Sequence, residues 1–181
     1  GEPLMSINEA TKANLRRKSG FVDIVQKIDG IPLFSWIDLN ITELCNRTCV
    51  FCPRVDEDLY PNQNLNMSLD LAEKMCSELA DLNYAGAIIL CGFGEPTLHP
   101  DVLRFIRALK GSYRLEIVTN GDKLTPESIE NLSDAGINYF VVSMYDGPHQ
   151  KEHFQTLFQQ AGLKENDFIL RDRWHDGVDD F

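Results

Sequence analysis

The sequence predicts an α/β fold built on a parallel sheet. Short apolar segments typical of strands alternate with segments whose apolar residues recur at helical spacing, and this alternation runs through most of the 181 residues. Strands and helices that alternate in this way form right-handed βαβ units with parallel strands. A second observation supports this fold: the unusual polar, glycine and cysteine motifs follow strand ends, where such sheets bind their ligands.

Residues 1–34 are expected to form an extension that precedes the core. A short polar helix is predicted at residues 6–18. Strand-like segments at residues 21–28 and 31–34 flank Asp29-Gly30, a dipeptide that favours a tight hairpin turn. The extension is therefore predicted to be a helix followed by a hairpin.

The core domain, residues 35–181, is expected to contain five strands and four helices. Ser68 is a suitable N-cap for the first of these helices, because its hydroxyl can accept a hydrogen bond from the first turn. A βαβ unit takes about 30 residues, so the sequence has room for five strands, and a sixth is missing or very irregular. The strands are predicted at residues 36–41, 87–91, 115–119, 139–143 and 168–170, and the helices from about 68 and at 101–110, 126–135 and 150–161.

Composition and charge favour an ordinary globular domain. The formal net charge is −11, which disfavours nucleic-acid binding, because that binding needs a positive surface against phosphate. No apolar run is long enough to span a bilayer. Five cysteines without a recognisable signal peptide favour free thiols in a reducing compartment. We therefore predict a cytoplasmic protein that binds neither membrane nor nucleic acid.

Three cysteines follow the first core strand in the run Leu-Cys-Asn-Arg-Thr-Cys-Val-Phe-Cys-Pro. Cys45, Cys49 and Cys52 have the spacing C-x3-C-x2-C. Thiolates hold iron–sulfur clusters, usually four to a cluster, so three local ligands leave one iron open to an exchangeable ligand. The alternative is a zinc site with a fourth ligand from Cys76, Cys91 or a histidine, although no second cysteine or histidine pair accompanies the run.

A second motif, Gly-Phe-Gly-Glu-Pro at residues 92–96, follows the next core strand. Together with the cysteine run, in which Phe51 precedes the last cysteine, it resembles the radical S-adenosylmethionine (SAM) superfamily over residues 35–171. The resemblance implies a partial (β/α)6 barrel. The missing sixth strand makes this barrel either truncated or completed by a C-terminal region or a partner chain. The Gly-Phe-Gly-Glu-Pro form is familiar from members with a C-terminal SPASM or twitch region.

The resemblance also implies a chemistry. A [4Fe–4S] cluster, reduced by an external electron donor, would cleave SAM to a 5′-deoxyadenosyl radical, which abstracts hydrogen from a peptide or small-molecule substrate. The competing hypothesis is a catalytically incomplete iron–sulfur or zinc-binding fragment with a structural or electron-transfer role.

Site residues follow from the resemblance by position. Cys45, Cys49 and Cys52 would bind three irons, and the methionine part of SAM would chelate the fourth. Phe51 would pack against adenine. Phe93 stands where the commonest form of the second motif has a glycine. The remaining assignments are Gly92, Phe93, Gly94 and Glu95 to the methionine amino group, Ser143 and Asn120 to the ribose hydroxyls, and Arg171 or Arg173 to the methionine carboxylate.

Several of these residues also have a purely structural interpretation. Cys76 and Cys91 are expected to pack in the core, with a site role left open for Cys91. Glu95 could instead be the carboxylate that starts a helix. The remaining alternatives are an ordinary turn at Asn120-Gly121, a turn or a substrate contact at Tyr145-Asp146, and a solvated strand end at Arg171 and Arg173.

Overall fold

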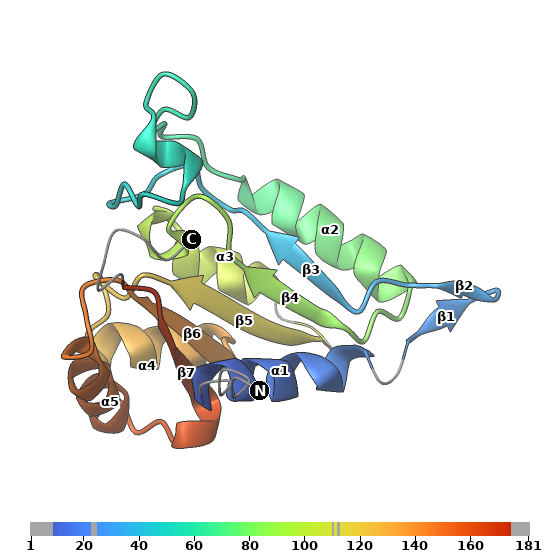
Figure 1. Ribbon diagram of the computed structural model, residues 1–181. Coiled ribbons are helices and arrows are strands. Elements are labelled where there is room, and N and C mark those ends of the chain that lie inside the picture. The colour runs from blue at the N-terminus through green and yellow to red at the C-terminus, as the bar shows by residue number, and fades with distance from the viewer. Residues whose placement is uncertain (1–8, 23–24, 110, 112, 175–181) are drawn as a thin grey trace, which may run out of the picture.

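The computed structural model describes residues 9–22, 25–109, 111 and 113–174. Its centre is a five-stranded sheet in which each strand pairs with the next along the chain, and every pair is parallel (Figure 1). The predicted α/β fold is confirmed. The strands are β3 (Trp36–Leu39), β4 (Ala87–Leu90), β5 (Arg114–Thr119), β6 (Tyr139–Met144) and β7 (Phe168–Asp172).

The helices that connect these strands cover one face of the sheet. Consecutive helices pack against one another. The predicted start of the first is confirmed, because the Ser68 hydroxyl accepts a hydrogen bond from the Leu71 N–H at 3.3 Å. The helices are α2 (Leu69–Asp81), α3 (Val102–Leu109), α4 (Pro126–Ala135) and α5 (Gln150–Gln160), and single turns of 3₁₀ helix occur at Pro53–Val55, Pro96–Leu98 and Glu165–Asp167.

The main hydrophobic core lies between these helices and the sheet. Alternate strand residues such as Leu90, Ile117 and Phe140 point into it and are buried. Phe105 of α3 and Phe158 of α5 are buried in the same core. Side chains of a strand alternate between the two faces of the sheet. The neighbours of these residues along each strand therefore point to the opposite face.

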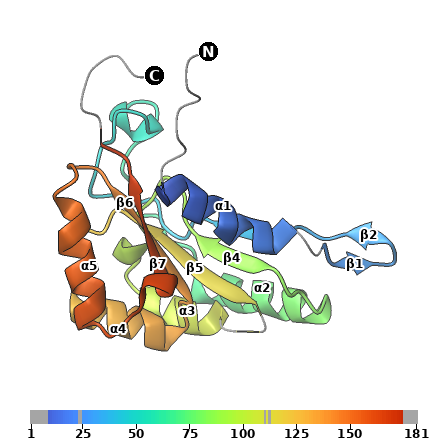
Figure 2. The same ribbon diagram turned by 60° about the horizontal axis from the view of Figure 1, so that its bottom comes forward.

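The N-terminal helix α1 (Glu9–Val22) lies on that other face, opposite α2, α3 and α4 (Figure 2). It packs against β7. Arg17 of α1 forms an ion pair with Glu116 of β5, whose side chain is fully buried. A small apolar cluster on this face consists of Tyr139, Val141 and Ile169, with Val118 packed against it.

The predicted hairpin is present but shorter than expected. Strands β1 (Lys27–Ile28) and β2 (Ile31–Pro32) pair antiparallel around Asp29 and Gly30, which both have positive φ. The expected strand at residues 21–28 is wrong at its start, because α1 continues to Val22. Tertiary packing of α1 outweighs the strand preference of an aromatic and a β-branched residue. The division between residues 34 and 35 stays a prediction.

In the described part of the chain, no sixth strand follows β7, so the sheet is an open, partial barrel. None of the helices described is long and apolar enough to cross a membrane.

Candidate active site

The loops after β3, β4, β5 and β6 lie at the carboxyl edge of the sheet (Figure 1). Residues of these loops line a pocket of about 190 Å³. Arg47, Val118, Thr119 and Tyr145 contribute to its lining. Every site residue predicted from the cysteine run and from the second motif lines this pocket. Arg171 and Arg173 do not line it. The predicted residues that line the pocket are Cys45, Cys49, Cys52, Phe51, Gly92, Phe93, Gly94, Glu95, Asn120 and Ser143.

The three cysteines of the run are free and half-buried. Burial raises the pKa of the Cys45 and Cys49 thiols, and the charges of neighbouring thiolates raise them further. All three cysteines line the pocket. In the described ranges, no three His, Cys, Asp or Glu side chains converge as they would around a single metal ion.

The other two cysteines lie outside the pocket. Cys76 packs against the core, with its Sγ 2.8 Å from the Tyr113 hydroxyl and 3.0 Å from the Ala108 carbonyl oxygen. Cys91 directly follows β4, and burial together with nearby Asp38 raises the pKa of its thiol to about 12. The core role predicted for Cys76 agrees with this packing.

The glycines of the second motif allow a close approach of two backbones. Gly92 has a φ of 140°, a value that other residues rarely adopt. A Cβ on Gly94 would overlap the carbonyl oxygen of Thr42. The Glu95 N–H donates to the Leu44 carbonyl at 2.7 Å. The motif is thus packed directly on the backbone that leads into the cysteine run.

Glu95 is buried, with 3% of its surface exposed. Its Oε1 accepts hydrogen bonds from the Thr97 N–H and hydroxyl and from the Thr119 hydroxyl, and its Oε2 accepts one from the Asn120 N–H at 2.8 Å. Burial raises the pKa of this carboxyl, while the hydrogen bonds act in the opposite direction. The carboxylate therefore caps the short helix at Pro96–Leu98 and joins it to the end of β5.

Arg54 is a buried cation that the sequence did not single out. Its guanidinium donates to the carbonyl oxygens of Phe93 and Glu43 and, at 3.3 Å, to Asn62 Oδ1. It also lies 4.9 Å from the ring centre of Tyr60. Arg54 thus fixes the second motif to the chain on both sides of the cysteine run. In the sequence, only its position two residues after Cys52 associates it with the site.

The aromatic side of the pocket is a pair of rings. Phe51 and Tyr145 stack with their centroids 5.7 Å apart and their planes inclined by 29°. Phe51 nevertheless remains 47% exposed. Burial raises the pKa of the Tyr145 hydroxyl. Tyr145 thus covers one face of the ring that was predicted to meet adenine.

Ser143 connects the pocket to Arg171. The Arg171 guanidinium donates to Ser143 Oγ at 2.9 Å, and its Nε is buried and has no hydrogen-bond partner in the described part of the chain. Burial and the charge of Arg173 lower the pKa of Arg171 to about 10. Arg173 itself is exposed, and the assignment of either arginine to the methionine carboxylate stays a prediction.

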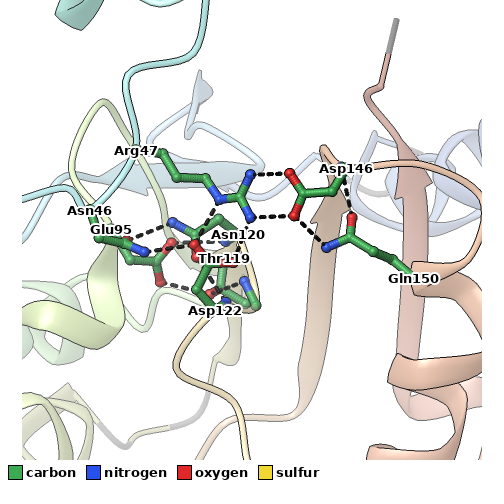
Figure 3. Close-up of polar contacts among 9 residues, drawn as sticks. Asn46, Arg47, Glu95, Thr119, Asn120, Asp122, Asp146 and Gln150 are labelled. Carbon is green, nitrogen blue, oxygen red and sulfur yellow. Dashed lines mark hydrogen bonds and ion pairs between the residues drawn. The ribbon is translucent and has the colours of Figure 1, made fainter. Parts of the chain in front are cut away.

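A set of polar contacts, here called the rim network, joins the cysteine run to the loops after β5 and β6. Figure 3 shows Arg47 lying between Asp122 and Asp146. Asn120 Nδ2 donates to Asn46 Oδ1 at 2.9 Å, and Asn120 Oδ1 accepts from the Asp122 N–H at 3.0 Å. The amide predicted to bind ribose is therefore already used within the protein. The network comprises Asn46, Arg47, Asn120, Asp122, Asp146 and Gln150.

Comparison of the chain with known protein families shows which family it belongs to. Residues 39–156 match the family model described as the Radical SAM superfamily. The chain belongs to the radical SAM superfamily. This family uses SAM and an iron–sulfur cluster, and its members similar to this chain are enzymes.

Two curated radical SAM proteins illustrate the relationship. The S-adenosyl-L-methionine-dependent 2-deoxy-scyllo-inosamine dehydrogenase of Niallia circulans is 30% identical over 145 residues, which are 77% of this chain and 56% of the relative. The AdoMet-dependent heme synthase of Methanosarcina barkeri (strain Fusaro / DSM 804) is 32% identical over 122 residues, which are 67% of this chain and 33% of the relative. The chain thus spans between one third and just over half of these relatives.

A solved radical SAM structure shares the fold. The crystal structure of BtrN in complex with AdoMet and 2-DOIA superimposes with a TM-score of 0.65 and 29% identity, covering 77% of this chain and 57% of that chain.

The residues present fit an iron–sulfur cluster better than a zinc ion. Three free thiols on one loop face one pocket, and each can bind a different iron of a cluster. A structural zinc ion takes four ligands, whereas the described lining of the pocket supplies three cysteines and no histidine.

Proposed function

We propose that this chain is the SAM-cleaving core of a radical SAM enzyme that abstracts hydrogen from a small-molecule substrate. The observation that carries the proposal is that one pocket is lined both by the three cysteines and by the ends of three further loops. A shared pocket would let the open iron of a cluster contact SAM directly.

Cys45, Cys49 and Cys52 would hold a [4Fe–4S] cluster, leaving the fourth iron for the amino and carboxylate groups of SAM. If bound there and reduced by an external donor, such a cluster would supply one electron for cleavage of the S–C5′ bond of SAM, which yields methionine and a 5′-deoxyadenosyl radical able to take a hydrogen atom. The chain itself contributes three half-buried thiols that line one pocket.

The remaining pocket residues would orient SAM. The backbone at Gly92 and Gly94 can come close to the methionine ammonium, because neither residue has a side chain in the way. Glu95 adds negative charge beside that group, although four donors already occupy most of its lone pairs. Phe51 would pack against adenine on the side away from Tyr145.

Ser143 and Arg171 form the other end of the proposed SAM site. The unpartnered Nε of Arg171 and its lowered pKa both indicate a cation that lacks a compensating charge. A carboxylate placed there would receive a charge-assisted hydrogen bond, and the methionine carboxylate is the candidate in SAM. Ser143 would present its hydroxyl to the ribose, while Asn120 would act mainly through the rim network.

A small polar substrate is favoured over a peptide. The relative from Niallia circulans is named for a dehydrogenation of 2-deoxy-scyllo-inosamine, and the neighbouring structure contains 2-DOIA together with AdoMet. We therefore place this chain's substrate among small hydroxylated or aminated molecules.

Cysteine substitution tests the cluster assignment. The chain and its Cys45→Ala, Cys49→Ala and Cys52→Ala variants would be reconstituted anaerobically with iron and sulfide, and iron content, visible absorption and SAM binding would be measured. We expect each variant to lose the cluster and bind SAM at least tenfold more weakly, since the open iron supplies two contacts to SAM.

Cys76→Ala is the matched control, because it also removes one thiol but lies outside the pocket. It should retain iron and SAM binding. Cluster assembly that survives loss of any one of the three pocket cysteines would contradict the assignment. A cluster that forms without any SAM binding would instead favour a structural or electron-transfer role.

A further inference from the structure

We propose that Arg47 is a positioning residue that fixes the cysteine run to the two loops completing the SAM side of the pocket. The inference rests on the proposed function, and it assigns a role to a side chain between two proposed iron ligands. Figure 3 shows this side chain spanning the gap from the cysteine run to the loops after β5 and β6.

Arg47 makes two forked contacts with carboxylates. Its Nε and Nη2 donate to the two oxygens of Asp122 at 2.7 Å, and its Nη1 and Nη2 donate to the two oxygens of Asp146 at 2.7 Å. Only the planar guanidinium of arginine can make such a pair of forks. Its Cζ also lies 5.4 Å from the ring centre of Tyr145.

Both carboxylates are held in place by other groups. Asp146 accepts from Gln150 Nε2 at 3.0 Å, and its own N–H donates to Gln150 Oε1 at 2.9 Å. Gln150 is 8% exposed at the start of α5. Asp122 is fixed through its backbone, because its N–H donates to Asn120 Oδ1 at 3.0 Å, and its carboxylate also accepts from Asn46 Nδ2 at 2.7 Å. Arg47 therefore binds to anchored partners rather than to freely moving surface carboxylates.

The cysteine run is tied to the pocket on two sides. On the side of β4 the ties are the buried Arg54 and the bond from Glu95 N–H to the Leu44 carbonyl. On the side of β5 and β6 the polar ties come from Asn46 and Arg47. Loss of Arg47 removes most of the second set and leaves two neighbouring carboxylates without their shared cation.

This second side carries Asn120, Ser143 and Tyr145, which line the proposed SAM site. Arg47 should therefore control how firmly the iron ligands are held relative to bound SAM. An exposed ion pair contributes little by itself, but a forked, partly buried arginine between two fixed carboxylates is a stronger constraint. Its side chain is only 20% exposed.

The test compares Arg47→Ala and Arg47→Lys with Arg104→Ala. Arg104 is an exposed arginine of α3 paired with Asp101 at 3.8 Å, so its removal is the matched control. For each reconstituted protein, the rate of iron loss to a chelator and the SAM dissociation constant would be measured. We expect Arg47→Ala to raise both the rate of iron loss and the SAM dissociation constant about tenfold, the order expected for loss of charge-assisted contacts. Arg47→Lys should recover part of this effect, and Arg104→Ala should show no change.

If Arg47→Ala and the wild type have the same rate of iron loss and the same SAM dissociation constant, the proposal is overturned. If Arg47→Ala does not fold, Asp146→Asn replaces it, because this partner is 48% exposed and loses one fork only. A shift of about threefold is then expected, the order for one weakened surface contact, and no shift would overturn the proposal.

Amide hydrogen exchange of the metal-free chain separates this inference from the proposed function. Residues 44–52 should exchange faster in Arg47→Ala than in Arg104→Ala, whether or not the wild type assembles a cluster. A wild-type chain that binds neither iron nor SAM would refute the proposed function, whereas unchanged exchange in Arg47→Ala would refute the role of Arg47.

Discussion

Two buried charged residues shape the pocket at the residue scale. Glu95 and Arg54 are each 3% exposed, and both satisfy their polar atoms with neighbouring backbone and side-chain groups. Because burying an unpaired charge is costly, each must be surrounded by partners. Glu95 could be recognised from its motif, whereas the partners of Arg54 lie up to 39 residues away in the chain, where spacing gives no information.

The raised pKa of Glu95 predicts a pH dependence of stability. A glutamate in an unfolded chain has a pKa of about 4.3, and burial places the folded value above this. Between the two values the folded state holds the proton more tightly, so this group's contribution to the free energy of unfolding falls as pH rises. Urea unfolding from pH 4 to 7 should show wild-type stability falling relative to Glu95→Gln.

Glu73→Gln, on the exposed side of α2, is the control for this comparison. Its difference from the wild type should stay nearly constant with pH. A wild-type advantage over Glu95→Gln that grows as pH rises would show that hydrogen bonding, not burial, dominates the titration of Glu95.

Asn120 illustrates the limit of sequence reasoning for single residues. Asn120 was predicted to follow the third core strand and to lie at the SAM site. It does follow β5 and lines the pocket. Its amide group, however, bonds to Asn46, which lies 74 residues earlier. A strand-end position predicts where a side chain lies, but its hydrogen-bond partner depends on loops brought together only by the fold.

At the scale of elements, the sequence predicted the helices and strands of the core closely. Their apolar periodicity reflects burial against one face of the sheet, so α4 begins and ends where predicted. The one clear error was the strand beginning at residue 21, where residue type favoured a strand but α1 continues along β7. That contact is made between distant segments and leaves no local pattern.

The N-cap of α2 gives a test at this scale. Ser68→Ala removes the hydroxyl that accepts from the Leu71 N–H, and it should lower the free energy of unfolding by about 1 kcal/mol. Ser77→Ala makes the same substitution at an exposed position within α2, where alanine is the better helix former. Urea unfolding should therefore show a lower free energy of unfolding for Ser68→Ala only. Equal stability of Ser68→Ala and Ser77→Ala would argue against the cap.

At the scale of the whole molecule, the parallel sheet accounts for the site. Its strands end at one edge, so residues from four separate loops meet in a pocket although they span Cys45 to Tyr145 in the chain. This gathering was predictable from the order of the elements. The roles of Arg47 and Arg54, which hold these loops together, could not be predicted, because nothing in their spacing marks them as structural.

The central claim is that this pocket couples a cluster to SAM cleavage. The most direct measurement is the amount of 5′-deoxyadenosine released from SAM by the reconstituted chain under anaerobic, reducing conditions. We predict product from the wild type and from Cys76→Ala, and none from the chain with Cys45, Cys49 and Cys52 all changed to alanine. Equal product from the triple variant, or a wild type that carries the cluster and binds SAM without releasing product, would contradict the claim.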